Sequence, residues 1–104
     1  MPQHSWFSGY EIKKARIYFL IMLEPRRVAL LTAGGIDLET LIDDLTGYGA
    51  AEPTRSYSYS GDKLTISQEL GSIPDGARSD AALKEFGRDL ATYVTQRIET
   101  LLGT

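Results

Sequence analysis

The chain has 104 residues, of which 42% are hydrophobic and 24% are charged. This composition is typical of one globular domain with a single core, and it excludes an intrinsically disordered protein. Acidic residues outnumber basic ones to give a net charge of −3, and the lack of cysteine excludes disulfides, thiolate nucleophiles and cysteine metal sites. The longest apolar run, residues 17–23, is too short to span a membrane, so we expect a cytoplasmic protein with no membrane partner.

The first nine residues are mostly polar, and they predict an N-terminal arm (residues 1–9) ahead of a single α+β domain (residues 10–104). Trp6 and Phe7 are the large apolar side chains of this arm. We expect them either to fold back on the domain or to dock on a partner.

Residues 17–23 are apolar at every position, which predicts a strand that is buried on both faces. A buried helix over residues 11–23 has the same apolar content and is the alternative. The strand is favoured because Pro25 follows it at the second position of a type I turn. Residues 28–32 would then return as the second strand of a hairpin.

Asp37 is a good N-cap, and it predicts the start of a helix that is ended by Gly47 and Gly49. Four apolar residues recur at helical spacing after it: Leu38, Leu41, Ile42 and Leu45.

Two short segments, residues 55–60 and 63–67, alternate strictly between polar and apolar residues. Gly61 and Asp62 between them match a type II′ hairpin turn, so a two-residue loop is predicted. The resulting register pairs Ser60 with Lys63, Tyr59 with Leu64, Ser58 with Thr65, Tyr57 with Ile66 and Ser56 with Ser67. One face of this hairpin would be polar and the other apolar.

A long amphipathic helix is predicted at the C-terminal end, capped by Ser79 or Asp80 and terminated by Gly103. Gly87 within it costs about 1 kcal/mol relative to alanine. A close approach between this helix and the sheet would explain the glycine.

The predicted fold is therefore α+β with the order ββαββα: a four-stranded antiparallel sheet with two helices packed on one face. Residues 17–23 would send apolar side chains to both faces of that sheet. Either the N-terminal arm, another element or a second subunit must cover the face opposite the helices.

No motif in the sequence has the residues that catalysis requires. The one histidine, His4, lies in the arm, and the junction at Thr32-Ala-Gly-Gly35 lacks the lysine of a phosphate-binding loop. Asp43 and Asp44 point in different directions on a helix. We therefore predict a protein that is not an enzyme and that binds no cofactor or metal.

The preferred interpretation is a protein-interaction domain of the inhibitor, immunity, chaperone or assembly type, which associates with itself as a homodimer or with another protein through a sheet face. The candidate binding residues are Trp6, Phe7, Tyr10, Tyr18 and Leu20. Phe19 and Ile21 would replace Tyr18 and Leu20 if the other face of the strand pointed outwards.

Two alternatives remain open. A small-ligand site or minor enzyme would use Tyr57, Tyr59 and Asp62 around a pocket. A nucleic-acid-binding module would use five basic residues: Lys13, Lys14, Arg16, Arg26 and Arg27. It is disfavoured because the basic residues are dispersed along the chain and form no stripe that could neutralise a phosphate backbone.

Overall fold

The computed structural model describes residues 5–48 and 52–103. Four strands form one antiparallel sheet in the order β1-β2-β4-β3, which confirms the predicted α+β class and sheet. The strands are β1 (Ser5–Lys13), β2 (Arg16–Leu23), β3 (Ser56–Ser60) and β4 (Lys63–Glu69).

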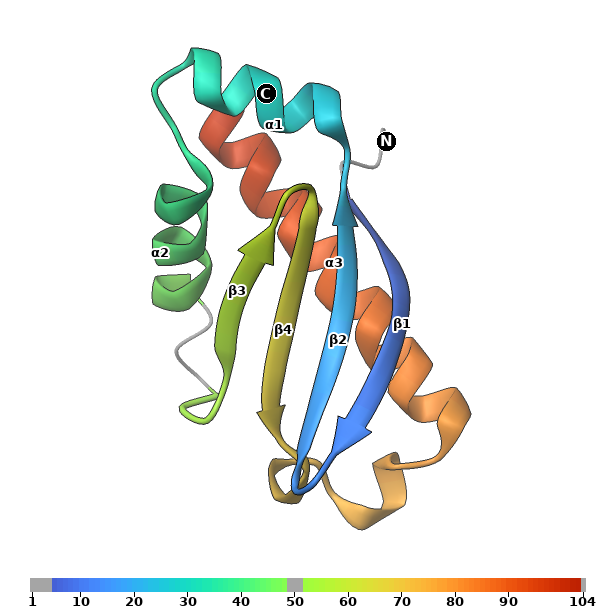
Figure 1. The fold of residues 1–104 in the computed structure, drawn as a ribbon. Helices are drawn as coiled ribbons and strands as arrows, with labels where there is room; N and C mark the ends of the chain where they lie inside the picture. The colour runs from blue at the N-terminus through green and yellow to red at the C-terminus, as the bar shows by residue number, and fades with distance from the viewer. Residues whose placement is uncertain (1–4, 49–51, 104) are drawn as a thin grey trace.

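Three helices accompany the sheet: α1 (Pro25–Ala33), α2 (Leu38–Tyr48) and α3 (Asp80–Leu102). Two single 3-10 turns, η1 (Leu70–Ser72) and η2 (Asp75–Ala77), link β4 to α3. The long helix α3 crosses one side of the sheet diagonally, α2 lies beside β3, and α1 lies at the end of the sheet where β2 finishes (Figure 1).

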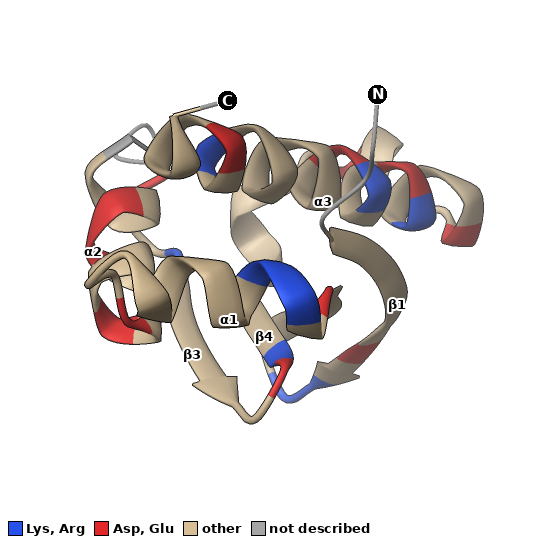
Figure 2. Ribbon diagram, turned by 90° about the horizontal axis from the view of Figure 1, so that it is seen from above, with Lys and Arg blue, Asp and Glu red and all other residues tan. Residues whose placement is uncertain are grey.

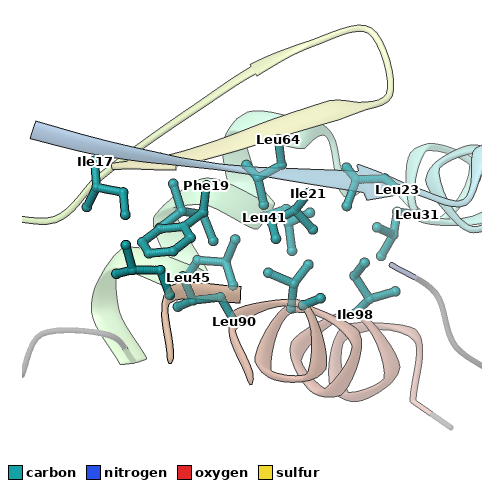
Figure 3. Close-up of a cluster of buried hydrophobic side chains, with 14 of the residues drawn as sticks. Ile17, Phe19, Ile21, Leu23, Leu31, Leu41, Leu45, Leu64, Leu90 and Ile98 are labelled. Carbon is teal, nitrogen blue, oxygen red and sulfur yellow. The ribbon is translucent and has the colours of Figure 1, made fainter. Parts of the chain in front are cut away.

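The core lies between the sheet and the helices. On β2, the side chains of the four odd-numbered positions from Ile17 to Leu23 are at most 1% exposed. They point towards α3 and its apolar residues Leu90 and Ile98 (Figure 3). Burying four such side chains contributes roughly 6–12 kcal/mol. The sheet and α3 therefore hold each other in place through β2.

The β3–β4 hairpin has the predicted register, from the Ser60–Lys63 pair to the Ser56–Ser67 pair. Gly61 takes a φ of +63° at the first turn position, as a type II′ turn requires. The apolar positions Leu64 and Ile66 are at most 1% exposed, so the alternation fixed the register by burying one face.

The predicted partner of residues 17–23 was wrong. Residues 28–32 form part of helix α1, and β2 pairs instead with β1. Pro25 occupies the first turn of α1, where its fixed φ and missing N–H suit a helix as well as a type I turn. Pro25 therefore could not distinguish a turn from a helix start.

The predicted N-terminal arm was also wrong for residues 5–9, which form the first half of β1; His4 and the rest of the arm lie outside the described residues. The β1–β2 turn contains Lys14 with a φ of +56°. A residue other than glycine, asparagine or aspartate is uncommon in that conformation. The sequence therefore carried no turn signal at this hairpin.

Strand β1 is fastened to α3 at its start and its middle. The Ser5 amide donates to Thr95 Oγ1 at 3.1 Å, and the Ser5 hydroxyl donates to the Ala91 carbonyl oxygen at 2.7 Å. Further along β1, the Phe7 ring occupies the space where a side chain on Gly87 would lie. This contact is the close approach of helix and sheet that Gly87 predicted.

Both longer helices begin as predicted. The Asp37 carboxylate accepts from the Thr40 amide at 2.8 Å ahead of α2, and Ser79 caps α3. The pair Asp44–Arg97, whose side chains are 12% and 15% exposed, joins α2 to α3 by two hydrogen bonds of 2.8 and 2.9 Å. The helical layer is therefore tied together by a largely buried ion pair.

Candidate functional site

The face of the sheet opposite α3 is not covered by any element of the part of the chain that the structure describes (Figure 1). The even-numbered residues of β2 point to this side, and after Arg16 they are Tyr18, Leu20 and Met22. Each of these side chains is partly exposed, whereas their odd-numbered neighbours are buried. Strand geometry thus divides one apolar segment between a core and an open face.

Trp6 extends this open face onto the edge strand β1. It pairs with Met22 across the β1–β2 ladder, and its side chain is 44% exposed. Next along β1, Gly9 pairs with Leu20 and places no side chain over it. We call the four residues Trp6, Tyr18, Leu20 and Met22 the open-face patch.

Polar residues surround the patch on the β3–β4 side. Lys63 pairs with Met22 at one end, and Ser67 pairs with Tyr18 at the other. The Arg16 guanidinium donates to Ser67 Oγ and to the Thr54 carbonyl oxygen, each at 3.0 Å. An apolar centre with a polar border is the layout of a protein-interaction surface.

The structure brings together three of the five predicted binding residues. Trp6, Tyr18 and Leu20 share the open face, whereas Phe19 and Ile21 belong to the core. The exposed side of β2 is thereby identified. Sequence reasoning did not single out Met22, although the alternation of residues 17–23 places it on the same side as Leu20.

Phe7 and Tyr10, the other two predicted binding residues, lie on the α3 side of the sheet. The ladder is irregular between Phe7 and Gly9, and this β-bulge turns Tyr10 to the side where it pairs with Phe19. If side chains alternated regularly from Trp6 to Tyr10, with no bulge between them, Tyr10 would lie on the same side as Trp6. Both side chains therefore hold β1 to α3 and are not part of the open-face patch.

The Tyr10 hydroxyl donates to Asp80 Oδ1 at 2.7 Å. This hydrogen bond raises the pKa of Tyr10, and with the ammonium of Lys84, 3.0 Å away, it lowers the pKa of Asp80. Asp80 begins α3, where a carboxylate also suits the helix dipole. The contact fixes the start of α3 to the middle of β1.

Tyr57, Tyr59 and Asp62, the residues of the small-ligand alternative, are not part of the open face. Tyr57 and Tyr59 point to the helix side with their partners Ile66 and Leu64, and Tyr59 is 46% exposed. The Tyr57 hydroxyl is buried and has no hydrogen-bond partner within the described residues. Asp62 lies in the hairpin turn, where its carbonyl oxygen accepts from the Leu23 amide.

The five basic residues of the nucleic-acid alternative form two groups. Lys13, Lys14 and Arg16 lie at the β1–β2 turn, whereas Arg26 and Arg27 lie in α1, beyond the other end of β2. Eight residues of strand β2 at about 3.3 Å each separate the groups by roughly 25 Å. Figure 2 shows the arginines of α1 as one basic segment, while basic and acidic residues are mixed along α3.

Two general searches of the described residues gave negative results. No three or more His, Asp or Glu side chains in residues 5–48 and 52–103 are grouped so that they could hold a metal ion. No helix in those ranges combines the length and apolar character needed to span a membrane. Comparisons with protein-family models, with curated proteins and with solved structures found no match for this chain.

Proposed function

We propose that this protein is a non-enzymatic interaction domain that self-associates by packing the open sheet faces of two copies against each other. The open-face patch carries the proposal, because four large apolar side chains lie together on a face that α3 does not cover. By analogy with other small α+β interaction domains, we propose a role of the inhibitor, immunity, chaperone or assembly type.

The size of the open face supports a weak dimer. Four strands at about 4.8 Å and seven residues at about 3.3 Å give a face of roughly 19 by 23 Å, or about 440 Å². Two such faces would remove roughly 900 Å² from water in projection, and more once the relief of the side chains is counted. Specific interfaces bury about 1,000 Å² or more, so this face is just sufficient.

Trp6 contributes most to the expected affinity. A tryptophan side chain presents up to about 250 Å², so 44% exposure leaves roughly 110 Å² to bury. At about 25 cal/mol per Å², each copy would gain 2–3 kcal/mol from this side chain alone. The two tryptophans together would contribute about 5 kcal/mol, which is little more than the minimum cost of association of about 4 kcal/mol. A micromolar dissociation constant requires a net gain of about 8 kcal/mol, so the other patch residues must supply most of it.

The face is a better surface for self-association than the free edge of β1. An edge strand can pair with another chain, but β-bulges and charged side chains prevent this in many proteins. Strand β1 carries both, with the irregularity between Phe7 and Gly9 and with Glu11 and Lys13 in its second half. The four members of the open-face patch are uncharged, and Glu11, which pairs with Tyr18, borders the patch on the β1 side.

A twofold axis near Leu20 would make the pairing self-complementary. An isologous interface presents the same patch on both subunits. An axis that crosses the strands at Leu20 would pack Leu20 on its own copy and Met22 on Tyr18 of the other copy. Two sheets packed in this way lie about 10 Å apart.

Sedimentation velocity over a wide concentration range tests the proposal. Between about 1 and 500 µM, the wild-type chain should shift from monomer to dimer with a micromolar dissociation constant. Trp6→Lys should raise the dissociation constant at least tenfold, because it places a charge in the interface.

Tyr59→Lys is the matched control. Tyr59 is as exposed as Trp6, at 46% against 44%, but it lies on the opposite side of the sheet. This variant should dimerise like the wild type. A wild-type chain that remains monomeric at 500 µM, or equal weakening by both substitutions, would overturn the proposal.

A further inference from the structure

Helix α1 exposes an apolar stripe at the end of the sheet. Of its nine residues, only Leu31 is buried. Arg26, Ala29, Leu30 and Ala33 follow the spacing i, i+3, i+4 and i+7 and therefore share one side of the helix. Leu30 is 50% exposed, which is a larger exposed fraction than the 44% of Trp6.

Leu30 also separates two hollows in the surface. One, of about 310 Å³, lies where α1 meets the C-terminal end of α3, and it is lined by Arg27, Leu30, Gly34, Ile36, Leu101 and Leu102. The other, of about 530 Å³, follows α1 and is lined by Glu24, Arg26 and Ala33 among others. Each volume is large enough to accept an apolar side chain of a partner.

The side chains that line these hollows carry two positive charges, those of Arg26 and Arg27, against the one negative charge of Glu24. Helix α1 contains Arg26 and Arg27 and no acidic residue, although the chain as a whole is acidic. Both arginines lie in the first turn, where the helix dipole disfavours cations. The Arg27 Nε is buried without a hydrogen-bond partner in the described residues, and it lies 3.5 Å from Glu24 Oε2 in an ion pair.

We infer that this surface docks an acidic amphipathic segment of another protein. A leucine-sized side chain of the partner would enter the hollow between Leu30 and Leu102. A carboxylate of the partner would pair with Arg26, because Arg27 is already paired with Glu24. Such binding of an apolar helix face in a groove is a common mode of peptide recognition. Because α1 lies at the end of the sheet, the open-face patch is left free.

An anionic membrane is the less suitable partner for the same surface. Segments that hold a protein to anionic lipid carry about four to eight Lys or Arg residues. Helix α1 has two, which is fewer than such a segment needs. Vesicles are therefore included in the test as the competing outcome.

The test is an NMR titration of the full chain with two helical peptides of about twelve residues. Both peptides carry leucines on one side of the helix; the acidic peptide has Glu at the remaining positions, and the basic peptide has Lys there. The acidic peptide should shift the backbone signals of α1 and of Leu101 in a saturable manner. The basic peptide should not. Vesicles of phosphatidylserine and phosphatidylcholine form the third arm.

Three variants locate the contact. Leu30→Asp should abolish saturable binding of the acidic peptide, and Arg26→Glu should weaken it about tenfold. Arg88→Glu is the control, because it makes the same charge change on the exposed surface of α3. Thermal melting of each variant separates loss of binding from loss of the fold.

Several results would overturn the inference. These are equal binding of both peptides, shifts that map away from α1, equal effects of Arg26→Glu and Arg88→Glu, and tighter binding to vesicles than to the acidic peptide. None of these outcomes bears on self-association through the open-face patch, so the two proposals fail independently.

Discussion

Replacing Gly87 with alanine should destabilise the protein, although alanine is the better helix former. On helix propensity alone, the change in the middle of α3 should stabilise the fold by about 1 kcal/mol. The added methyl group would, however, overlap the ring of Phe7 from β1. The ring or the helix must therefore move to admit one carbon atom.

The size of the effect follows from these opposing contributions. Overpacking a contact of this kind costs about 1–3 kcal/mol. After subtraction of the gain in propensity, Gly87→Ala should lower the free energy of unfolding by about 1 kcal/mol. With alanine at position 7 there is no ring to displace, so the same substitution should raise the stability by about 1 kcal/mol. The coupling between the two positions is then about 2 kcal/mol.

A double-mutant cycle in urea measures this coupling. The four chains are the wild type, Gly87→Ala, Phe7→Ala and the double variant, unfolded at one low protein concentration so that self-association does not contribute. The midpoint should fall for Gly87→Ala in the wild-type background and rise in the Phe7→Ala background. A rise in both backgrounds would show that the Phe7 ring does not lie over Gly87.

Three further predictions concern single sites. Thr95→Val leaves the buried Ser5 amide without its acceptor, so it should cost about 2 kcal/mol in urea unfolding, whereas Thr95→Ser should cost about half as much; equal costs would contradict the role of the hydroxyl. Gly61→Ala forces a methyl-bearing residue to a φ of +63° and should lower the melting temperature by about 5–10 °C, a loss that Gly61→Asn should partly avoid. The hydrogen bonds from Thr40 lower the pKa of Asp37, so its contribution is present at neutral pH and is lost as the pH falls from about 4, the ordinary value for aspartate, through that lowered pKa. Urea midpoints measured over that range should therefore decline less steeply for Asp37→Asn than for the wild type, and identical slopes would refute the assignment.

The parts of the fold that could be predicted from the sequence are those with local signals. The β3–β4 hairpin combines strict alternation with a Gly-Asp turn, and α3 has a serine cap, a continuous apolar stripe and a terminal glycine in the left-handed conformation. In both elements the pattern of burial and the turn or cap residues favour the same structure. A segment is predictable when its burial pattern and its turn or cap residues agree in this way.

Strand β1 could not be predicted because its stabilising contacts are distant in the sequence. Ser5 is hydrogen-bonded to Thr95, 90 residues away, and the Phe7 ring lies over Gly87. The turn that joins β1 to β2 uses Lys14, which carries no turn signal. Without this strand as the partner of β2, the apolar residues after Pro25 were the nearest candidates for a hairpin.

The candidate site was predictable only in part. Strand alternation places Tyr18 and Leu20 on one side of β2 and Phe19 on the other, but it does not say which side meets the helices. For β1, the bulge before Gly9 changes the phase of the alternation and moves Tyr10 away from Trp6. A single inserted residue therefore decided which aromatic side chains belong to the open face.

Quenching of the single tryptophan tests the central claim most directly. Trp6 is the only tryptophan of the chain and lies on the open face with 44% of its side chain exposed. If two copies pack these faces together, acrylamide quenching of Trp6 should fall as the protein concentration rises, in parallel with the increase in sedimenting mass. Constant quenching while the mass doubles would place the interface elsewhere, and constant mass would show that the open face does not join two copies.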